Sequence, residues 1–244
     1  MSPRPDIAVV TGASGGIGAA VSRALHARGE GHLRLALHCN AHAEAADALS
    51  RELPGSFVVR ADLSTAAGRD TLLAAALAQG SPFILVNNAG VDRPHEPALD
   101  IEEASFDRMI ELNLKAPVLL MKAFGREMAR AGSGVIVNVS SVLARVAVTG
   151  SAVYRLTKAA LEEATRQFAM ELGPRGVRVN AVAPGFIATP MTESLTDEMR
   201  ERFLRQIAAG EFGRPEAVAA AICGLVENDY VNGAVLSVDG GIAL

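Results

Sequence analysis

A tyrosine and a lysine four residues apart could act together as an acid–base pair. Tyr154 and Lys158 lie in a stretch with apolar residues at helical spacing, where positions i and i+4 share one helix face. A nearby ammonium group favours the phenolate, so we expect Lys158 to lower the pKa of Tyr154 from its reference value of about 10. Such a phenol could exchange a proton near neutral pH. Alone, the pattern is weak, because surface helices produce it by chance.

Two further polar residues could serve the same reaction. Ser141 follows an apolar run and could donate a hydrogen bond to a carbonyl oxygen, although it could equally cap a turn. Asn113 lies within a helical pattern, where asparagine is unfavourable. Its position predicts either a local kink that holds a water molecule or a simple junction between two helices.

A glycine-rich segment, residues 11–18, follows the first apolar run and opens a helical pattern. Glycine lets the backbone turn sharply and approach a ligand, and a helix N-terminus attracts a pyrophosphate. The spacing of the glycines is looser than G-x-G-x-x-G, and the lysine of a P-loop is missing. A tight turn without a ligand is the alternative. The residues predicted to contact a cofactor here are Gly12, Ser14, Gly15, Gly16, Ile17 and Gly18.

Two more polar or small-residue segments follow apolar runs. Asp62 and Leu63 come after the third run, where a carboxylate could accept a hydrogen bond from an adenine amino group or cap the next helix. Asn88, Ala89 and Gly90 come after the fourth run, where small residues let the backbone touch a cofactor.

Seven short apolar runs alternate with helical patterns, which predicts a single-domain, Rossmann-like α/β fold over residues 1–244. Right-handed crossovers then give a doubly wound parallel sheet with helices on both faces. Ligands of such sheets bind beyond the carboxyl ends of the strands, so the segments above should meet at one edge. The predicted strands are Ile7–Val10, Leu33–Leu37, Phe57–Arg60, Phe83–Val86, Val135–Val139, Val177–Val182 and Val235–Val238.

Residues 187–213 break this alternation. Charged residues surround apolar ones such as Met199, Phe203 and Ile207. The segment follows a strand end, so we expect an amphipathic lid over the substrate.

The composition excludes several classes of function. The chain has 244 residues, 50% of them hydrophobic, and a net charge of −4, without the basic stripe of a nucleic-acid-binding protein. No apolar run approaches the ~18 residues of a membrane span, and Met1–Asp6 lacks the pattern of a signal peptide. Cys39 and Cys223 fit buried thiols better than a disulfide framework. We expect a soluble cytoplasmic protein, without a metal site.

Taken together, the chain resembles the short-chain dehydrogenase/reductase family from Asp6 to Gly241. The resemblance rests on residues 11–18, 62–63 and 87–90, on Asn113, Ser141, Tyr154 and Lys158, and on Pro184-Gly185. It implies that Asn113, Ser141, Tyr154 and Lys158 form a catalytic tetrad for hydride transfer from a nicotinamide to a carbonyl carbon. In that tetrad Tyr154 gives the proton, Ser141 places the oxygen, Lys158 also holds the nicotinamide ribose, and Asn113 fixes a relay water. Pro184, Gly185, Ile187 and Thr189 become further cofactor contacts, with Tyr154 and Lys158.

The end of the second run indicates which nicotinamide cofactor is used. Sheets that bind NAD usually place a carboxylate there, on the ribose 2′-hydroxyl. This chain has none, and His38, Asn40 or His42 could bond a 2′-phosphate. We therefore predict NADPH, although many NADP-using relatives carry a basic residue at the position of Gly15.

Within the family, the chain is most similar to 3-oxoacyl-acyl-carrier-protein reductases, chiefly in residues 183–192, 212–216, 232–233 and 238–241. That resemblance implies reduction of a 3-oxoacyl thioester to the 3-hydroxyacyl thioester in fatty-acid or polyketide-type biosynthesis. It also implies docking of an acidic acyl carrier protein on Arg175 and Arg130. Both arginines could equally be ordinary charges near helix ends.

Other interpretations stay open. The tetrad would also suit coenzyme A thioesters, free ketones, alcohols or sugars, and a non-catalytic cofactor sensor or structural subunit is the alternative of another class. By resemblance we expect a homotetramer, or an assembly with a paralogous subunit. The helices over 114–130 and 152–172 would meet in it, with close approach at Ala159, Ala160 and Ala164.

Overall fold

The seven predicted strands are present in the computed structural model and form one parallel sheet, in the order β3-β2-β1-β4-β5-β6-β7. The structure describes residues 6–29, 32–92, 96–193 and 195–242. Residues 1–5, which bear on the signal-peptide prediction, and residue 194 of the predicted lid lie outside these ranges. The strands are β1 (Asp6–Val10), β2 (Leu33–Cys39), β3 (Phe57–Arg60), β4 (Ser81–Asn87), β5 (Gly134–Val139), β6 (Val177–Pro184) and β7 (Val235–Val238).

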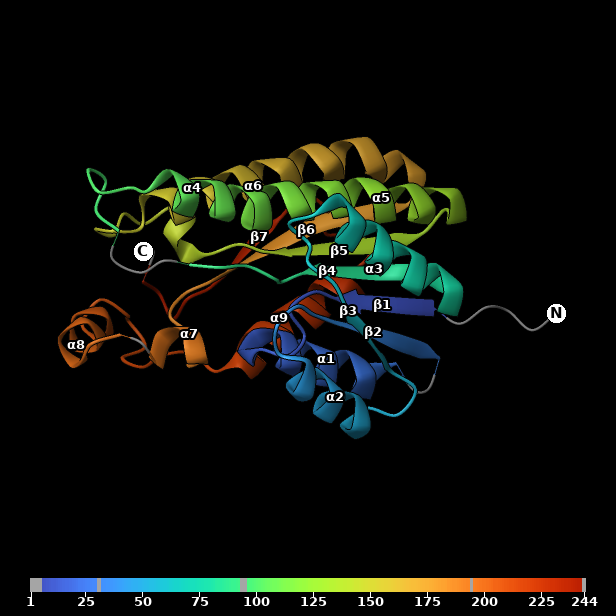
Figure 1. Cartoon of the computed structure of the whole chain (residues 1–244), viewed down its shortest axis with the longest axis horizontal. Coiled ribbons are helices and arrows are strands. Elements are labelled where there is room, and N and C mark those ends of the chain that lie inside the picture. Colours follow the sequence, from blue (N-terminus) through green and yellow to red (C-terminus); the bar gives the residue numbers. More distant parts are fainter. Residues whose placement is uncertain (1–5, 30–31, 93–95, 194, 243–244) are drawn as a thin grey trace.

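Helices cover both faces of this sheet, which confirms the doubly wound fold (Figure 1). One face packs against α1 (Gly16–Arg28), α2 (Ala43–Glu52) and α9 (Pro215–Glu227). The other packs against α3 (Ala66–Gln79), α5 (Ala116–Ala131) and α6 (Ala152–Leu172). Because the strand order reverses between β1 and β4, the chain leaves the edge between them open to a ligand.

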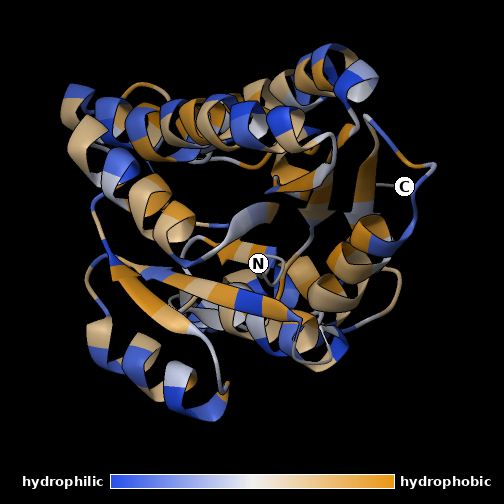
Figure 2. Cartoon of the chain, turned by 90° about the vertical axis from the view of Figure 1, so that its right-hand side faces the viewer, coloured by the Kyte–Doolittle hydropathy of each residue, from blue (hydrophilic) through white to orange (hydrophobic). Residues whose placement is uncertain are grey.

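Burial on both faces explains why the strands read as continuous apolar runs. Along β1, Ala8 and Val10 join one apolar cluster, whereas Ile7 and Val9 join the other. All four side chains are fully buried. A strand covered on one face would alternate apolar and polar residues instead. Figure 2 shows hydrophobic residues along the strands, between helices that carry hydrophilic residues as well.

The helical pattern around Asn113 contains an irregular turn. A π-helix, η1 (Glu111–Lys115), joins α4 (Glu103–Ile110) to α5. Asn113 is buried in its middle. Such single π-turns are rare and occur frequently at functional sites, so the predicted interruption of the helix is a wide turn rather than a break.

The segment after β6, which the sequence predicts to be a lid, leaves the sheet. It contains α7 (Pro190–Glu193) and α8 (Asp197–Leu204), which lie beyond the edge where the strands end (Figure 1). A parallel bridge between Ile187 and Gly213 closes its base. Phe203 is buried and stacks on Phe186, with 4.0 Å between ring centroids. The segment is thus held by side-chain packing and by backbone hydrogen bonds, such as that from the Ala209 N–H to the Gly240 carbonyl oxygen at 2.9 Å.

Two short 3-10 helices complete the fold. The first, η2 (Val142–Ala144), follows Ser141, and the second, η3 (Gly173–Arg175), precedes β6. Among the described residues, no helix is long and apolar enough to cross a membrane.

Candidate active site

The segments singled out in the sequence gather at one edge of the sheet. The glycine-rich turn follows β1, residues 88–90 follow β4, Ser141 lies just beyond β5, and Gly185 follows β6. Because all these strands are parallel, their carboxyl ends face the same side.

The glycine-rich turn has a backbone geometry that larger residues could not adopt. Gly12 has φ +65°, in the left-handed region. A Cβ on Gly18 would lie 2.1 Å from the Gly12 carbonyl oxygen, whereas a Cβ on Gly15 would meet nothing closer than 3.9 Å. The first helical bond runs from the Ala19 N–H to the Gly15 carbonyl. The N–H groups of residues 16–18 therefore precede the hydrogen-bond ladder of α1, in the arrangement that suits a pyrophosphate.

Hydrogen bonds with the segment after β4 hold this turn in place. The Thr11 hydroxyl accepts hydrogen bonds from the N–H groups of Asn88 and Ala89, each at 2.9 Å. The Asn88 amide donates to the carbonyl oxygens of Thr11, at 2.9 Å, and Gly12, at 3.1 Å. Asn88 thus supports the turn with its side chain. Sequence reasoning missed Thr11, although it begins the glycine-rich segment.

His38 has a different role from the predicted contact with a cofactor phosphate. Its side chain is 2% exposed, and both ring nitrogens are bonded within the protein. The Gly12 N–H donates to Nδ1 at 3.1 Å, and Nε2 lies 2.9 Å from the Ala61 carbonyl oxygen. Burial lowers the pKa of His38 below its usual value of 6.5. The neutral imidazole therefore links the glycine-rich turn to the residue that follows β3 through two hydrogen bonds.

The other residues predicted to contact the cofactor after β2 and β3 differ in their exposure. Asn40 and His42 are exposed just beyond β2, where a phosphate could reach them. The Asp62 carboxylate accepts from the N–H and the hydroxyl of Ser64, at 3.0 and 2.7 Å, and these bonds lower its pKa. Leu63 is buried. Asp62 therefore stabilises the turn after β3 and does not cap the next helix, because the N-cap of α3 is Thr65. Its contact with an adenine amino group stays a prediction.

Asn113 binds the segment after β4 through its side chain. Its Oδ1 accepts from the Val91 N–H and its Nδ2 donates to the Val91 carbonyl, both at 2.8 Å. Nδ2 also lies 3.4 Å from the Thr157 hydroxyl on α6. The π-turn thus fixes Val91 beside α6.

Lys158 is buried close to these groups. Its ammonium donates to the Val139 carbonyl at 2.8 Å and lies 5.5 Å from the centroid of the Tyr154 ring. A Cβ on Gly90 would lie 3.1 Å from Asn113 Oδ1 and 3.7 Å from Lys158 Nζ, so Gly90 leaves room for both. Burial lowers the pKa of Lys158 to about 8, and Asp92 opposes that shift. The structure therefore brings Asn113, Lys158 and Tyr154 together, with Asp92 as a neighbour that the sequence did not suggest.

The pKa of Tyr154 is raised, so the expected lowering by Lys158 is wrong. Burial is the main cause, because it penalises the phenolate, and the Asp92 carboxylate adds to it. A hydrogen bond with Ser141 acts in the opposite direction. The phenol is thus protonated at neutral pH, which is the form that donates a proton.

The segment after β6 completes the site from the lid side. A Cβ on Gly185 would lie 2.8 Å from Asp239 Cα, so glycine allows the C-terminal segment to pack there. The Thr189 methyl group approaches the start of α1: a Cβ on Gly16 would lie 2.5 Å from it. The predicted contacts Pro184, Gly185, Ile187 and Thr189 therefore run from the end of β6 to the glycine-rich turn.

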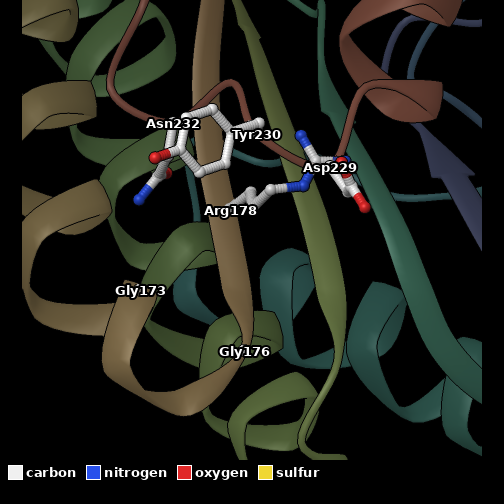
Figure 3. A pocket seen from close by; sticks show the side chains of 6 residues that line it. All are labelled: Gly173, Gly176, Arg178, Asp229, Tyr230 and Asn232. Carbon is white, nitrogen blue, oxygen red and sulfur yellow. The ribbon is translucent and has the colours of Figure 1, made fainter.

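A hollow of about 450 Å³ lies elsewhere, at the opposite edge of the sheet (Figure 3). Arg178 crosses it and donates to the carbonyl oxygens of Leu225, Val226 and Val231, at 2.7 to 3.0 Å. These bonds give the guanidinium a structural role. The lining residues are Gly173, Gly176, Arg178, Asp229, Tyr230 and Asn232, and none belongs to the predicted site.

Comparison with known proteins agrees with this geometry. Residues 12–243 match the family described as enoyl-(acyl carrier protein) reductase. A cis-4-hydroxycyclohexanecarboxylate dehydrogenase of Sinomonas cyclohexanicum is 39% identical, over 96% of this chain and 95% of its own. A 3-oxoacyl-[acyl-carrier-protein] reductase of Staphylococcus aureus is 36% identical, over 96% and 97%.

A solved structure agrees as well. A short chain dehydrogenase/reductase family protein superposes with a TM-score of 0.89 at 32% identity, covering 100% of this chain and 99% of that one. The sequence match and this superposition both extend over nearly the whole chain, including every residue of the site. The chain therefore belongs to the short-chain dehydrogenase/reductase family and is an oxidoreductase that acts on a CH–OH or C=O group.

Proposed function

We propose that the protein reduces a 3-oxoacyl thioester to the 3-hydroxyacyl thioester with NADPH, in fatty-acid or polyketide-type biosynthesis in the cytoplasm. The observation that carries the proposal is the partly buried phenol of Tyr154, which pairs with Ser141 and whose raised pKa keeps it protonated. Relatives named 3-oxoacyl-[acyl-carrier-protein] reductases, 35% and 36% identical, support the substrate.

The proposed chemistry assigns a task to each residue of the tetrad. A bound nicotinamide supplies the hydride that reduces the carbonyl carbon. Tyr154 donates its phenolic proton to the carbonyl oxygen, while the Ser141 hydroxyl donates a hydrogen bond that places this oxygen. The Lys158 ammonium stabilises the phenolate that remains. Asn113 keeps the segment after β4 in position and, through the π-turn, holds the relay water.

NADPH is favoured over NADH by the groups beyond β2. A carboxylate there would repel a 2′-phosphate, and none is present. His38 is turned into the protein, so Asn40 and His42 remain as the phosphate partners. Open space above Gly15 gives the phosphate further room.

Carrier docking on Arg130 and Arg175 would need a second copy of the chain. Both residues are exposed, but Arg130 lies in the last turn of α5 and Arg175 follows the far end of α6. Tyr154 lies at the near end of α6, whose 21 residues span about 30 Å. A thioester docked on Arg175 could reach Tyr154 of another copy if the α6 helices paired antiparallel.

The exposed face of α6 supports such pairing. Leu156 and Met170 are 60% and 76% exposed and lie two heptads apart, on nearly the same helix face. Ala159 between them is also exposed, and Ala160 and Ala164 are partly so. We propose that this face mediates a homotetramer, or an assembly with a paralogous subunit, in which α5 takes part.

A second candidate function is oxidation of a secondary alcohol on a free carboxylic acid. The relative at 39% identity is named for such a reaction. The same tetrad would serve it in the reverse direction, with Tyr154 accepting a proton. The two candidates differ in the substrate that the lid admits.

One assay separates the candidates. NADPH absorbance is followed with purified protein and a 3-oxoacyl thioester, on carrier protein and on coenzyme A. NAD⁺ or NADP⁺ reduction is followed in parallel with a hydroxycyclohexanecarboxylate. We expect the highest kcat/KM for NADPH and the carrier-bound thioester, and a higher KM for that substrate after Arg175→Glu. A higher kcat/KM for the free alcohol would establish the second function, and an unchanged KM would exclude docking on Arg175.

A further inference from the structure

The catalytic helix carries a buried carboxylate that the tetrad does not use. Glu162 lies one turn beyond Lys158 and two turns beyond Tyr154, on the same face of α6. Its side chain is only 5% exposed. An unpaired carboxylate would be costly there, so its partners decide what it does.

Those partners lie on both sides of Ser141 in the chain. The Ser140 hydroxyl donates to Glu162 Oε1 at 3.0 Å, and it also lies 3.3 Å from the Lys158 carbonyl oxygen. The Arg145 guanidinium donates to Glu162 Oε2 at 3.3 Å. One carboxylate therefore holds the residue before Ser141 and the residue that ends the following 3-10 helix, η2.

Further bonds link this arrangement to the rest of the fold. Arg145 also donates to the Ser237 hydroxyl on β7 at 3.1 Å. Arg166, one turn along α6, approaches Glu162 at 3.9 Å, although it pairs more closely with Glu163, at 2.8 Å. The segment between the two contacts has its own backbone bonds, from Ala144 to Ser141 and from Val146 to Val142. The Arg155 guanidinium also donates to the Leu143 carbonyl at 2.8 Å, and the Ser140 N–H donates to the Val182 carbonyl at 2.8 Å. Glu162 therefore adjusts a segment that keeps other anchors.

We propose that Glu162, with Ser140 and Arg145, forms a clasp that sets the position of the Ser141 hydroxyl relative to Tyr154. Glu162 and Arg145 are then positioning residues. A carboxylate has two oxygens and so can hold two segments at once, which an apolar side chain of similar size could not do. The role in turnover rests on the proposed function, whereas the clasp itself can be tested without a substrate.

The expected effect of breaking the clasp follows from the need for alignment. A misplacement of about 1 Å in a reacting group can cost about 100-fold in rate. Glu162→Gln keeps the size of the side chain and its contact with Ser140, but it loses the charge that holds Arg145. Because Arg145 is 42% exposed, its guanidinium can be hydrated after the change, and the fold should survive. We expect kcat to fall about 10-fold or more, with little change in the Kd for NADPH.

Glu163→Gln is the matched control. It removes the same charge one position along α6, from a side chain that is 74% exposed, and it breaks the pair with Arg166. We expect it to leave kcat and hydrogen exchange unchanged. Arg145→Met breaks the clasp from its exposed end, should Glu162→Gln fail to fold.

The test combines amide hydrogen exchange with kinetics. Exchange of residues 141–146 should be faster in Glu162→Gln and Arg145→Met than in the wild type or Glu163→Gln, without any substrate. In a Ser141→Ala background, Glu162→Gln should no longer lower the residual kcat. Unchanged exchange in the folded Glu162→Gln and Arg145→Met proteins would overturn the clasp. It would also be overturned if Glu162→Gln lowered kcat in the Ser141→Ala background as much as it does in the wild type. Faster exchange in the two variants, together with no turnover of a 3-oxoacyl thioester by the wild type, would keep the clasp and reject the proposed substrate.

Discussion

The glycine-rich turn and the lid border the same site, but they are held in different ways. The turn is fixed by backbone geometry and by hydrogen bonds in which the side chains of Thr11 and His38 accept and that of Asn88 donates. The lid is held by the bridge between Ile187 and Gly213, by the hydrogen bond from the Ala209 N–H to the Gly240 carbonyl, and by the stacking of Phe203 on Phe186. Hydrogen bonds to the sheet fix the groups that carry out the chemistry, whereas side-chain packing shapes the substrate side. Substitutions should therefore affect catalysis most in the fixed region and substrate selection most in the lid.

The largest effect should follow from Tyr154→Phe, which removes the proton donor of the fixed region. General acid catalysis contributes about 10²- to 10⁴-fold in rate, so we expect kcat to fall within that range. The Kd for NADPH, measured by fluorescence, should change little. A variant with more than half of the wild-type kcat would remove Tyr154 from the mechanism.

Gly18→Ala should show how rigid the turn is. The new Cβ would lie 2.1 Å from the Gly12 carbonyl oxygen, and the backbone cannot yield without moving the N–H groups that face the cofactor. Overpacking of this kind costs about 2 kcal/mol, which corresponds to about a 30-fold rise in the Kd for NADPH if it acts on the bound form. Gly15→Ala, which meets open space, is the control and should bind NADPH like the wild type. Equal affinities of the two variants would contradict the rigid turn.

In the lid, Phe203→Leu should change substrate binding more than cofactor binding. It keeps an apolar residue in a buried position but loses the aromatic pair with Phe186, worth about 1 kcal/mol. We expect KM for the thioester to rise about 5-fold, with the Kd for NADPH within about 2-fold of the wild type. Phe106→Leu, on α4 outside the lid, controls for the loss of an aromatic ring. A larger change in the Kd for NADPH than in the KM for the thioester would mean that the lid belongs to the cofactor site.

The smallest effect should be a pH dependence of the free energy of unfolding that arises from His38 at the glycine-rich turn. His38 is neutral in the fold, with Nδ1 accepting from the Gly12 N–H, and its pKa lies below 6.5. In the unfolded chain the imidazole takes up a proton near pH 6.5, so the stabilisation is present above that pH and is lost as the pH falls through the folded-state pKa. We expect the free energy of unfolding to fall below about pH 6.5, more in the wild type than in His38→Asn. His42→Gln, which removes an exposed histidine, should keep the wild-type dependence.

The sequence predicted the sheet well because both of its faces are buried. Runs such as Ile7–Val10 and Val135–Val139 have no polar alternation, and their strands match the structure to within one residue. It also predicted which segments meet, since the carboxyl ends of parallel strands share an edge. What it could not predict is where each side chain points. His38 and Asn88 turn inward to the protein, and that depends on bonds to residues 23 to 77 positions away.

The pKa of Tyr154 shows a second limit of the sequence. Helical spacing indicated Lys158 as a neighbour but gave no measure of burial. Burial reverses the expected direction of the shift, and Asp92 reinforces it from a loop after β4. Glu162 escaped notice for a related reason: its partners Ser140 and Arg145 are 22 and 17 positions away, and only the folded chain shows that they flank Ser141.

Hydride transfer itself tests the central claim most directly. Purified protein is incubated with NADPH deuterated at C4 of the nicotinamide and a 3-oxoacyl thioester, and the product is analysed by mass spectrometry. We predict a 3-hydroxyacyl thioester that carries deuterium at C3, formed by the wild type and nearly absent with Tyr154→Phe. Product without deuterium, or an equal yield from both proteins, would contradict direct transfer to a carbonyl protonated by Tyr154.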